Sequence, residues 1–203
     1  MSATMVKICG ITDAASALAA AEAGADMIGF HFCPSKRRIT PEAARRILSE
    51  LPRRPTVVGV FIDPSEREVE EVCAQVGLDR VQLHGAEAPG FRAPVDVIKV
   101  LKVRDGVLPD ASAWPDPVLL DSWSADGRGG TGRTWDWDLA AGFTARRRVI
   151  VAGGLDPDNV AEVVRRLRPF GVDVSSGVES APGTKDPTRV RAFVQAVNQV
   201  VRS

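Results

Sequence analysis

Two side chains in this sequence could transfer protons. Cys9 ends the apolar run that begins at Val6 and precedes a glycine, and Asp121 directly follows the apolar run 118–120. A thiol and a carboxyl group have reference pKa values of about 8.5 and 3.9, so they can act as base and acid once the protein brings both values closer to the working pH. The plainer alternatives are a packing cysteine and a capping aspartate. We select Cys9 and Asp121 as the candidate catalytic pair.

Four further polar residues stand in or just beyond other apolar runs and could hold a ligand. They are Arg37, Arg38, His84 and Asp173. Adjacent arginines are usually solvated, but one guanidinium reaching over a site could bind a substrate carboxylate with two hydrogen bonds. No metal-binding set or catalytic triad accompanies His84, so we expect it to line the site.

Two small-residue turns indicate a phosphate site. Gly153-Gly154 follows one apolar run, and Ser175-Ser176-Gly177 follows the next. Such turns expose successive backbone N–H groups, which bind anions. Glycines that merely allow a tight turn are the alternative.

The segment Gly129-Gly130-Thr131-Gly132 is less specific, because it lacks the lysine of a nucleotide-binding phosphate loop. We expect a lid or a positioning loop there.

These residues need elements to position them, and the chain supplies eight short apolar runs separated by polar breaks. The expected strands are Val6 to Cys9, Met27 to Phe32, Thr56 to Phe61, Arg80 to Leu83, Val95 to Val100, Val118 to Leu120, Val149 to Val151 and Val172 to Val174. Expected helices are 14–23, 41–51, 66–76, 158–167 and 187–201. Strands that are apolar on both faces belong to a parallel sheet covered on both sides.

The pattern predicts an α/β fold, a (β/α)8 TIM barrel formed by residues 1–203 as a single domain. The candidate residues then gather at the carboxyl ends of its strands, where such barrels have their active sites. Gly106 and Pro109 break any helix in 105–114, so we expect a shortened or irregular fifth helical connector. An open doubly wound sheet is the rival fold, but the first turn lacks the three glycines of its cofactor fingerprint.

Composition excludes several classes of protein. The 26 Lys and Arg residues balance 26 Asp and Glu residues, so no net charge favours nucleic acid or an anionic membrane. Three cysteines without a CxxC pair predict neither a disulfide framework nor a structural zinc site. We expect a cytoplasmic protein that uses no metal and no cofactor, and that is a monomer or a homodimer.

Several ordered motifs resemble the phosphoribosylanthranilate isomerase family along nearly the whole chain. They are Lys7-Ile8-Cys9-Gly10-Ile11-Thr12, Gly29-Phe30, Gly59-Val60-Phe61, Val81-Gln82-Leu83-His84-Gly85, Leu120-Asp121-Ser122, Gly129-Gly130-Thr131-Gly132, Gly153-Gly154-Leu155 and 172–179. The resemblance implies an aldose–ketose isomerase of tryptophan biosynthesis on a (β/α)8 barrel. Its cofactor-independent Amadori rearrangement converts N-(5-phosphoribosyl)anthranilate, a phosphorylated small molecule, to 1-(2-carboxyphenylamino)-1-deoxyribulose 5-phosphate.

The resemblance also implies roles for the candidate residues. Asp121 is similar to the general acid that opens the ribose ring, and Cys9 to the general base that removes the C2 proton. Arg37 is similar to the arginine at the anthranilate end, although Arg38 stands where the family has tyrosine and the loop is one residue shorter. His84 and Asp173 line the site.

The resemblance further implies that the turns Gly153-Gly154 and Ser175-Ser176-Gly177 bind the phosphate, through backbone amides at Gly154, Ser176 and Gly177.

Two alternatives remain open. One is the histidine-pathway isomerase on the same barrel, or a dual-substrate enzyme, but that chemistry has an aspartate at the place of Cys9. The other is a non-catalytic barrel kept as a phosphate-ligand sensor, which the presence of both proton-transfer groups disfavours.

Overall fold

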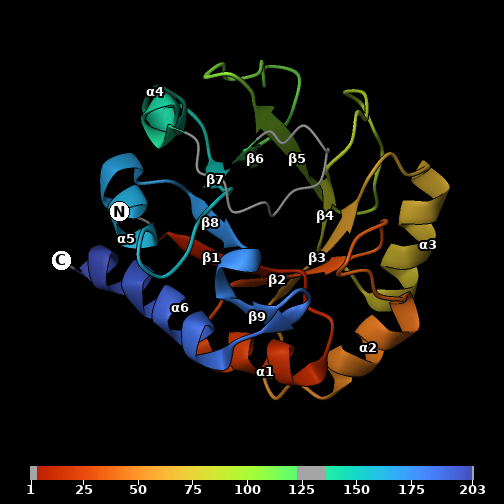
Figure 1. Ribbon diagram of the computed structural model, residues 1–203. Helices are drawn as coiled ribbons and strands as arrows, with labels where there is room; N and C mark the ends of the chain where they lie inside the picture. The colour runs from red at the N-terminus through yellow and green to blue at the C-terminus, as the bar shows by residue number, and fades with distance from the viewer. Residues whose placement is uncertain (1–3, 123–135, 203) are drawn as a thin grey trace.

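The computed structural model describes residues 4–122 and 136–202 of the chain. Its eight parallel strands pair in chain order and close into a barrel through the pairing of β1 with β8 (Figure 1). The strands are β1 (Met5–Cys9), β2 (Met27–His31), β3 (Thr56–Phe61), β4 (Arg80–Leu83), β5 (Asp96–Val103), β6 (Val118–Ser122), β7 (Val149–Val151) and β8 (Gly171–Val174). The predicted barrel fold is confirmed.

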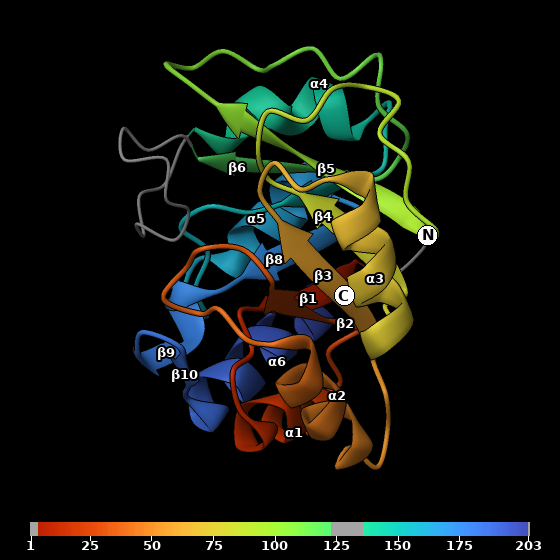
Figure 2. The ribbon, with the colours of Figure 1, turned by 90° about the vertical axis from the view of Figure 1, so that its right-hand side faces the viewer.

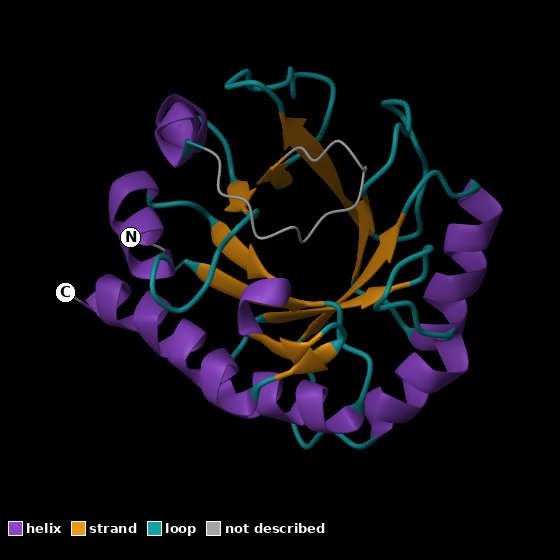
Figure 3. Ribbon diagram, in the orientation of Figure 1, coloured by secondary structure: helices purple, strands orange, loops and turns teal. Residues whose placement is uncertain are grey.

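Helices cover much of the outside of the barrel (Figure 3). They are α1 (Ala14–Ala23), α2 (Pro41–Ser49), α3 (Glu66–Val76), α4 (Ala141–Thr144), α5 (Val160–Leu167) and α6 (Pro187–Arg202), with the short 3-10 helices η1 (Trp137–Ala140) and η2 (Ser176–Val178). A small antiparallel hairpin, β9 (Glu179–Ala181) and β10 (Thr184–Lys185), follows β8 and lies at one end of the barrel (Figure 2).

Local sequence explains where the first three helices begin. The side chains of Asp13, Thr40 and Ser65 accept hydrogen bonds from backbone N–H groups three residues later. Each thereby satisfies a donor that the first turn of a helix leaves unpaired. In the part of the chain that the structure describes, no helix combines the length and the apolar character that crossing a membrane requires.

The predicted irregular fifth connector is confirmed, since the segment from Arg104 to Pro117 contains no helix. The fourth connector, 84–95, also lacks one, which the sequence analysis did not predict (Figure 3). Pro89, Gly90 and Pro94 interrupt it. In this sector Lys99 pairs with Glu87 and lies 5.1 Å from the ring centroid of Trp114.

Two predicted strands end two or three residues too early. Strand β5 was expected at Val95 to Val100 but runs on to Val103, because pairing with β6 continues through Val103 and Ser122. Asp121 was expected just after its strand and instead lies inside β6. The cross-strand partner of Asp121 is Lys102, a residue that the shorter strand would have left in a loop.

The barrel interior has an apolar and a polar part. Buried apolar side chains from five strands, with one residue just after β7, form a cluster separate from the larger core that the strands share with the helices: Met27, Val58, Ile98, Val100, Leu119, Ile150 and Ala152. Polar groups lie toward the carboxyl ends of the strands, where Lys7, Asp121 and Asp173 are buried. The interior of the barrel is therefore apolar in one part and polar toward the carboxyl ends of its strands.

Candidate active site

Cys9 is the last residue of β1, and its side chain is almost fully enclosed at 4 % exposure. Its Sγ lies 3.4 Å from Nε2 of His31, the last residue of β2. A Cβ atom at Gly29 would lie 2.8 Å from this sulfur and 3.3 Å from Lys7 Nζ, so glycine is what leaves room for both groups. Burial raises the pKa of the Cys9 thiol, and the Lys7 ammonium opposes that rise.

Lys7 and Asp173 form an ion pair inside the barrel. Lys7 Nζ donates to Asp173 Oδ1 at 2.9 Å, and the lysine side chain is fully buried. Burial disfavours the ammonium, but the Asp173 carboxylate and the Cys9 sulfur together outweigh burial and raise the pKa of Lys7 above its ordinary value. Lys7 is therefore a fixed positive charge two residues before Cys9, on the same face of β1.

Asp121 is held by a lysine and accompanied by a histidine. Lys102 Nζ on β5 donates to Asp121 Oδ2 at 2.7 Å, and His84 Nε2 lies 3.7 Å from the same oxygen. Burial, with Lys102 as the next cause, lowers the pKa of His84 to about 3. The imidazole is therefore neutral, and its Nε2 accepts a hydrogen bond from Lys102.

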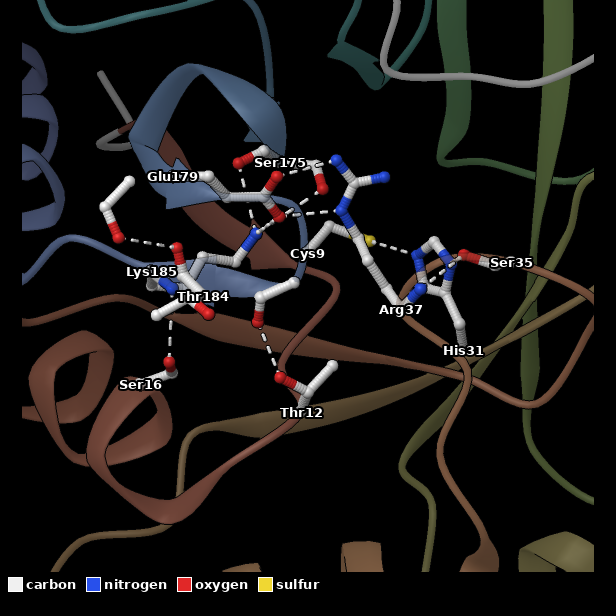
Figure 4. A network of polar contacts seen from close by, with 12 residues as sticks. Cys9, Thr12, Ser16, His31, Ser35, Arg37, Ser175, Glu179, Thr184 and Lys185 are labelled. Atoms are coloured by element: carbon white, nitrogen blue, oxygen red, sulfur yellow. Dashed lines mark hydrogen bonds and ion pairs between the residues drawn. The ribbon is translucent and has the colours of Figure 1, made fainter.

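The Arg37 side chain passes over the backbone of Gly10 and forms two hydrogen bonds with the Glu179 carboxylate (Figure 4). Nε and Nη2 donate to the two carboxylate oxygens at 2.7 and 2.8 Å. Lys185 Nζ approaches the same carboxylate at 2.8 Å. Burial alone would raise the pKa of Glu179, but these donors lower it. Arg38, by contrast, is exposed.

The two small-residue turns lie side by side, because β7 and β8 are paired. Gly153 and Gly154 have φ values of 86° and 74°, which only glycine adopts without strain. Gly177 packs against the carbonyl oxygen of Leu155, leaving no space for a Cβ atom. Within the described parts of the chain, the N–H groups of Gly153, Gly154, Ser176 and Gly177 donate to no backbone carbonyl. These donors are available to an anion.

The structure brings most of the predicted site residues together. All belong to strands or to the segments that follow them at the carboxyl end: Cys9, Arg37, His84, Asp121, Gly153, Gly154, Asp173, Ser175, Ser176 and Gly177. The Gly129 to Gly132 loop lies outside the described residues. Within those residues, no group of three or more His, Cys, Asp or Glu side chains is placed to hold a metal ion.

Five residues that contact the predicted ones were not predicted from the sequence: Lys7, His31, Lys102, Glu179 and Lys185. Lys7 and His31 could have been found from the two-residue period of strands, which puts Lys7 on the face of Cys9 and His31 on that of Gly29. Lys102 was not predicted because the expected strand ended at Val100, two residues before it. Nothing local marked Glu179 and Lys185 as partners of Arg37, since 142 positions separate Arg37 from Glu179.

The chain is similar to known proteins in both sequence and structure. Residues 6–196 match the family model described as N-(5'phosphoribosyl)anthranilate (PRA) isomerase. N-(5'-phosphoribosyl)anthranilate isomerase from Pelobacter propionicus is 48% identical over 199 residues, covering 96% of this chain and 95% of the relative.

Solved structures similar to this chain come from the same family. Phosphoribosyl anthranilate isomerase from Thermus thermophilus superposes with a TM-score of 0.87 at 38% identity, covering 97% of this chain and 100% of that one. A phosphoribosyl anthranilate isomerase in complex with reduced 1-(o-carboxyphenylamino)-1-deoxyribulose 5-phosphate has a TM-score of 0.81 at 37% identity, covering 97% and 99%. The chain therefore belongs to the phosphoribosylanthranilate isomerase family.

Proposed function

We propose that this chain isomerises N-(5-phosphoribosyl)anthranilate to 1-(2-carboxyphenylamino)-1-deoxyribulose 5-phosphate, as an enzyme of tryptophan biosynthesis acting in the cytoplasm. The observation that carries the proposal is the common placement of three groups at one end of the barrel. Cys9 ends β1, Asp121 lies near the end of β6, and the anion-binding turns follow β7 and β8.

Asp121 is the proposed general acid. Asp121 acts in its protonated form: Lys102 holds Oδ2, so the proton is carried on Oδ1 and passes from there to the ribose ring oxygen, which leaves the carboxylate paired with Lys102. The C1–O bond then breaks and the ring opens to a Schiff base. Gly153 supports this geometry, because a Cβ atom there would lie 2.9 Å from Oδ1.

Cys9 is the proposed general base. As a thiolate it removes the C2 proton of the Schiff base, and the resulting enolamine tautomerises to the ketone product. Lys7 supports this role, since its fixed positive charge next to the sulfur favours the thiolate against burial.

Substrate recognition uses both ends of the molecule. The N–H groups of Gly154, Ser176 and Gly177, in the turns Gly153-Gly154 and Ser175-Ser176-Gly177, bind the 5-phosphate. Arg37 binds the anthranilate end through Nη1, because Glu179 occupies Nε and Nη2.

Asp173 and His84 line the space between these ends.

The test is consumption of phosphoribosylanthranilate by the purified protein, with and without a chelator. Equal turnover in both conditions, with formation of the deoxyribulose phosphate product, is the expected result. No turnover by the folded protein would refute the proposal and favour the phosphate-ligand sensor. Sedimentation equilibrium of the same sample distinguishes a monomer from a homodimer.

Complementation tests the histidine-pathway alternative. We expect the gene to rescue a tryptophan auxotroph that lacks this isomerase and not the corresponding histidine auxotroph, because Cys9 stands where that chemistry uses an aspartate. Rescue of both strains would show dual specificity.

A further inference from the structure

The Cys9 thiol is buried, and it must lose a proton before it can act as a base. Its 4 % exposure leaves almost no contact with water, the usual acceptor of a thiol proton. The thiolate, not the thiol, is the reactive form of cysteine. A path for the proton from the sulfur to the solvent is therefore needed.

Such a path begins at His31. Cys9 Sγ lies 3.4 Å from His31 Nε2, within hydrogen-bond range for sulfur, and His31 Nδ1 lies 3.1 Å from Ser35 Oγ. Ser35 is exposed, and the backbone N–H of Arg37 donates to its hydroxyl oxygen at 3.0 Å. Figure 4 shows the sulfur, the ring and the hydroxyl in a row leading away from β1.

The surroundings keep the imidazole neutral. Burial is the largest cause that lowers the pKa of His31 to about 3, followed by nearby cations. The titratable groups that face Cys9 and His31 come from several elements: Lys7 on β1, Cys33 and Arg37 after β2, His84 after β4, Asp173 on β8, and Glu179 and Lys185 in the hairpin. A neutral ring has one protonated nitrogen and one free lone pair, which a relay requires.

We propose that His31 and Ser35 form a proton relay that carries the Cys9 proton from the barrel interior to solvent, an inference that rests on the proposed role of Cys9 as base. The S–H bond breaks with its electron pair left on sulfur, and the proton binds Nε2. Nδ1 passes its proton to Ser35 Oγ, which releases its own hydroxyl proton to water.

The relay leaves the thiolate with a donor. The new Nε2–H group points at the sulfur and stabilises its charge, as Lys7 also does. After the thiolate has taken the C2 proton it is a thiol again. When product leaves and water enters the site, Nε2 gives its proton to that water and Nδ1 takes one through Ser35, which returns the ring to its Nδ1–H form. His31 does not touch substrate in this scheme, so it is a positioning residue.

Chemical rescue tests the relay. We expect His31→Ala to lower kcat by about 10²-fold, the lower end for a positioned proton-transfer group. Imidazole in the buffer should raise kcat of this variant about tenfold, and the increase should be proportional to the concentration of neutral imidazole. Val60→Ala, in the same apolar cluster as Cys9 and Cys33, is the matched packing control and should show no rescue.

Thiol alkylation gives a readout that needs no substrate. In a Cys33→Ser, Cys73→Ser background, Cys9 is the remaining thiol. The pH dependence of its reaction with iodoacetamide should move upward by roughly one pH unit in His31→Ala, because the thiolate loses its donor. His31→Gln, whose amide can still donate, should retain the wild-type alkylation profile but turn over slowly.

Two results would overturn the relay. One is near-normal kcat in His31→Ala, and the other is a low kcat without imidazole rescue and with an unchanged alkylation profile, which is the signature of a packing role. If the wild-type protein fails to consume phosphoribosylanthranilate, the proposed function fails instead, and the alkylation profiles alone decide whether His31 takes the Cys9 proton.

Discussion

Lys7 Nζ and Asp173 Oδ1 meet at 2.9 Å inside the barrel, where the lysine side chain has no exposed surface. The two residues are adjacent because β1 closes the barrel against β8, with Lys7 and Asp173 as partners in the register. The Asp173 carboxylate helps to keep Lys7 protonated, so a positively charged ammonium group lies beside Cys9. The ion pair also joins β1 to β8, and removing either residue would leave the other charge buried without a partner.

Asp173→Asn should destabilise the protein by about 3–5 kcal/mol, because it leaves the buried Lys7 ammonium without a counter-charge. Urea unfolding measures the change. Asp96→Asn is the control, since Asp96 pairs with Arg80 at the surface with 77% of its side chain exposed, and such pairs contribute about 0–1 kcal/mol. Equal effects of the two substitutions would contradict a buried charge pair.

Asp121→Asn and Cys9→Ser should each lower kcat by about 10²- to 10⁴-fold, the usual contribution of a positioned acid or base. Steady-state turnover of phosphoribosylanthranilate measures both. Cys73→Ser is the matched control, because Cys73 packs in α3 and should leave turnover near the wild-type value. Full activity in either site variant would rule out its assigned role.

Arg37→Gln should raise KM for phosphoribosylanthranilate by about tenfold or more, since a charge-assisted contact contributes about 1.5–3 kcal/mol. Glu179 keeps Lys185 as a partner at 2.8 Å, so the hairpin retains one of its contacts. Arg38→Gln, at the exposed neighbour, should leave KM unchanged. The reverse pattern would assign the anthranilate end to Arg38.

Gly177→Ala should weaken phosphate binding by about tenfold, equivalent to about 1.4 kcal/mol. The added Cβ would overlap the Leu155 carbonyl oxygen and push η2 away from the turn after β7. Competitive inhibition by inorganic phosphate reports the change. Gly142→Ala in α4 meets only ordinary contacts and is the control. An unchanged inhibition constant would place the phosphate elsewhere.

Stability should fall between pH 6.5 and pH 5 because the native protein keeps its histidines neutral. The pKa values of His31 and His84 are lowered to about 3, so the unfolded chain binds protons in this range that the native state does not. The unfolding free energy should drop by up to about 2 kcal/mol for each histidine.

Urea midpoints at pH 7 and pH 5 measure this loss. The chain has only these two histidines, so His31→Gln combined with His84→Gln removes all histidine titration. The double variant should lose less stability than the wild-type protein over the same interval. An equal loss would mean that other groups are responsible.

Local sequence alone determined much of the protein. Apolar β-branched runs and capped helices predicted the eight strands and the fold. The spacing of apolar residues that distinguishes a strand from a helix can be read from residues close together in the sequence. Since parallel strands end at one face, Cys9, Asp121 and the turns after β7 and β8 could be placed together without coordinates.

The partners of those residues were decided only by tertiary structure. Lys7 and Asp173 are 166 positions apart, and Arg37 and Glu179 are 142 apart. No local pattern encodes such pairs. They arise when β1 closes against β8 and the β9–β10 hairpin folds over the loop after β2. The ammonium group beside Cys9, the contact of Lys102 with Asp121 and the pairing of Arg37 with Glu179 all follow from that closure and from strand register, because these contacts exist only in the folded chain.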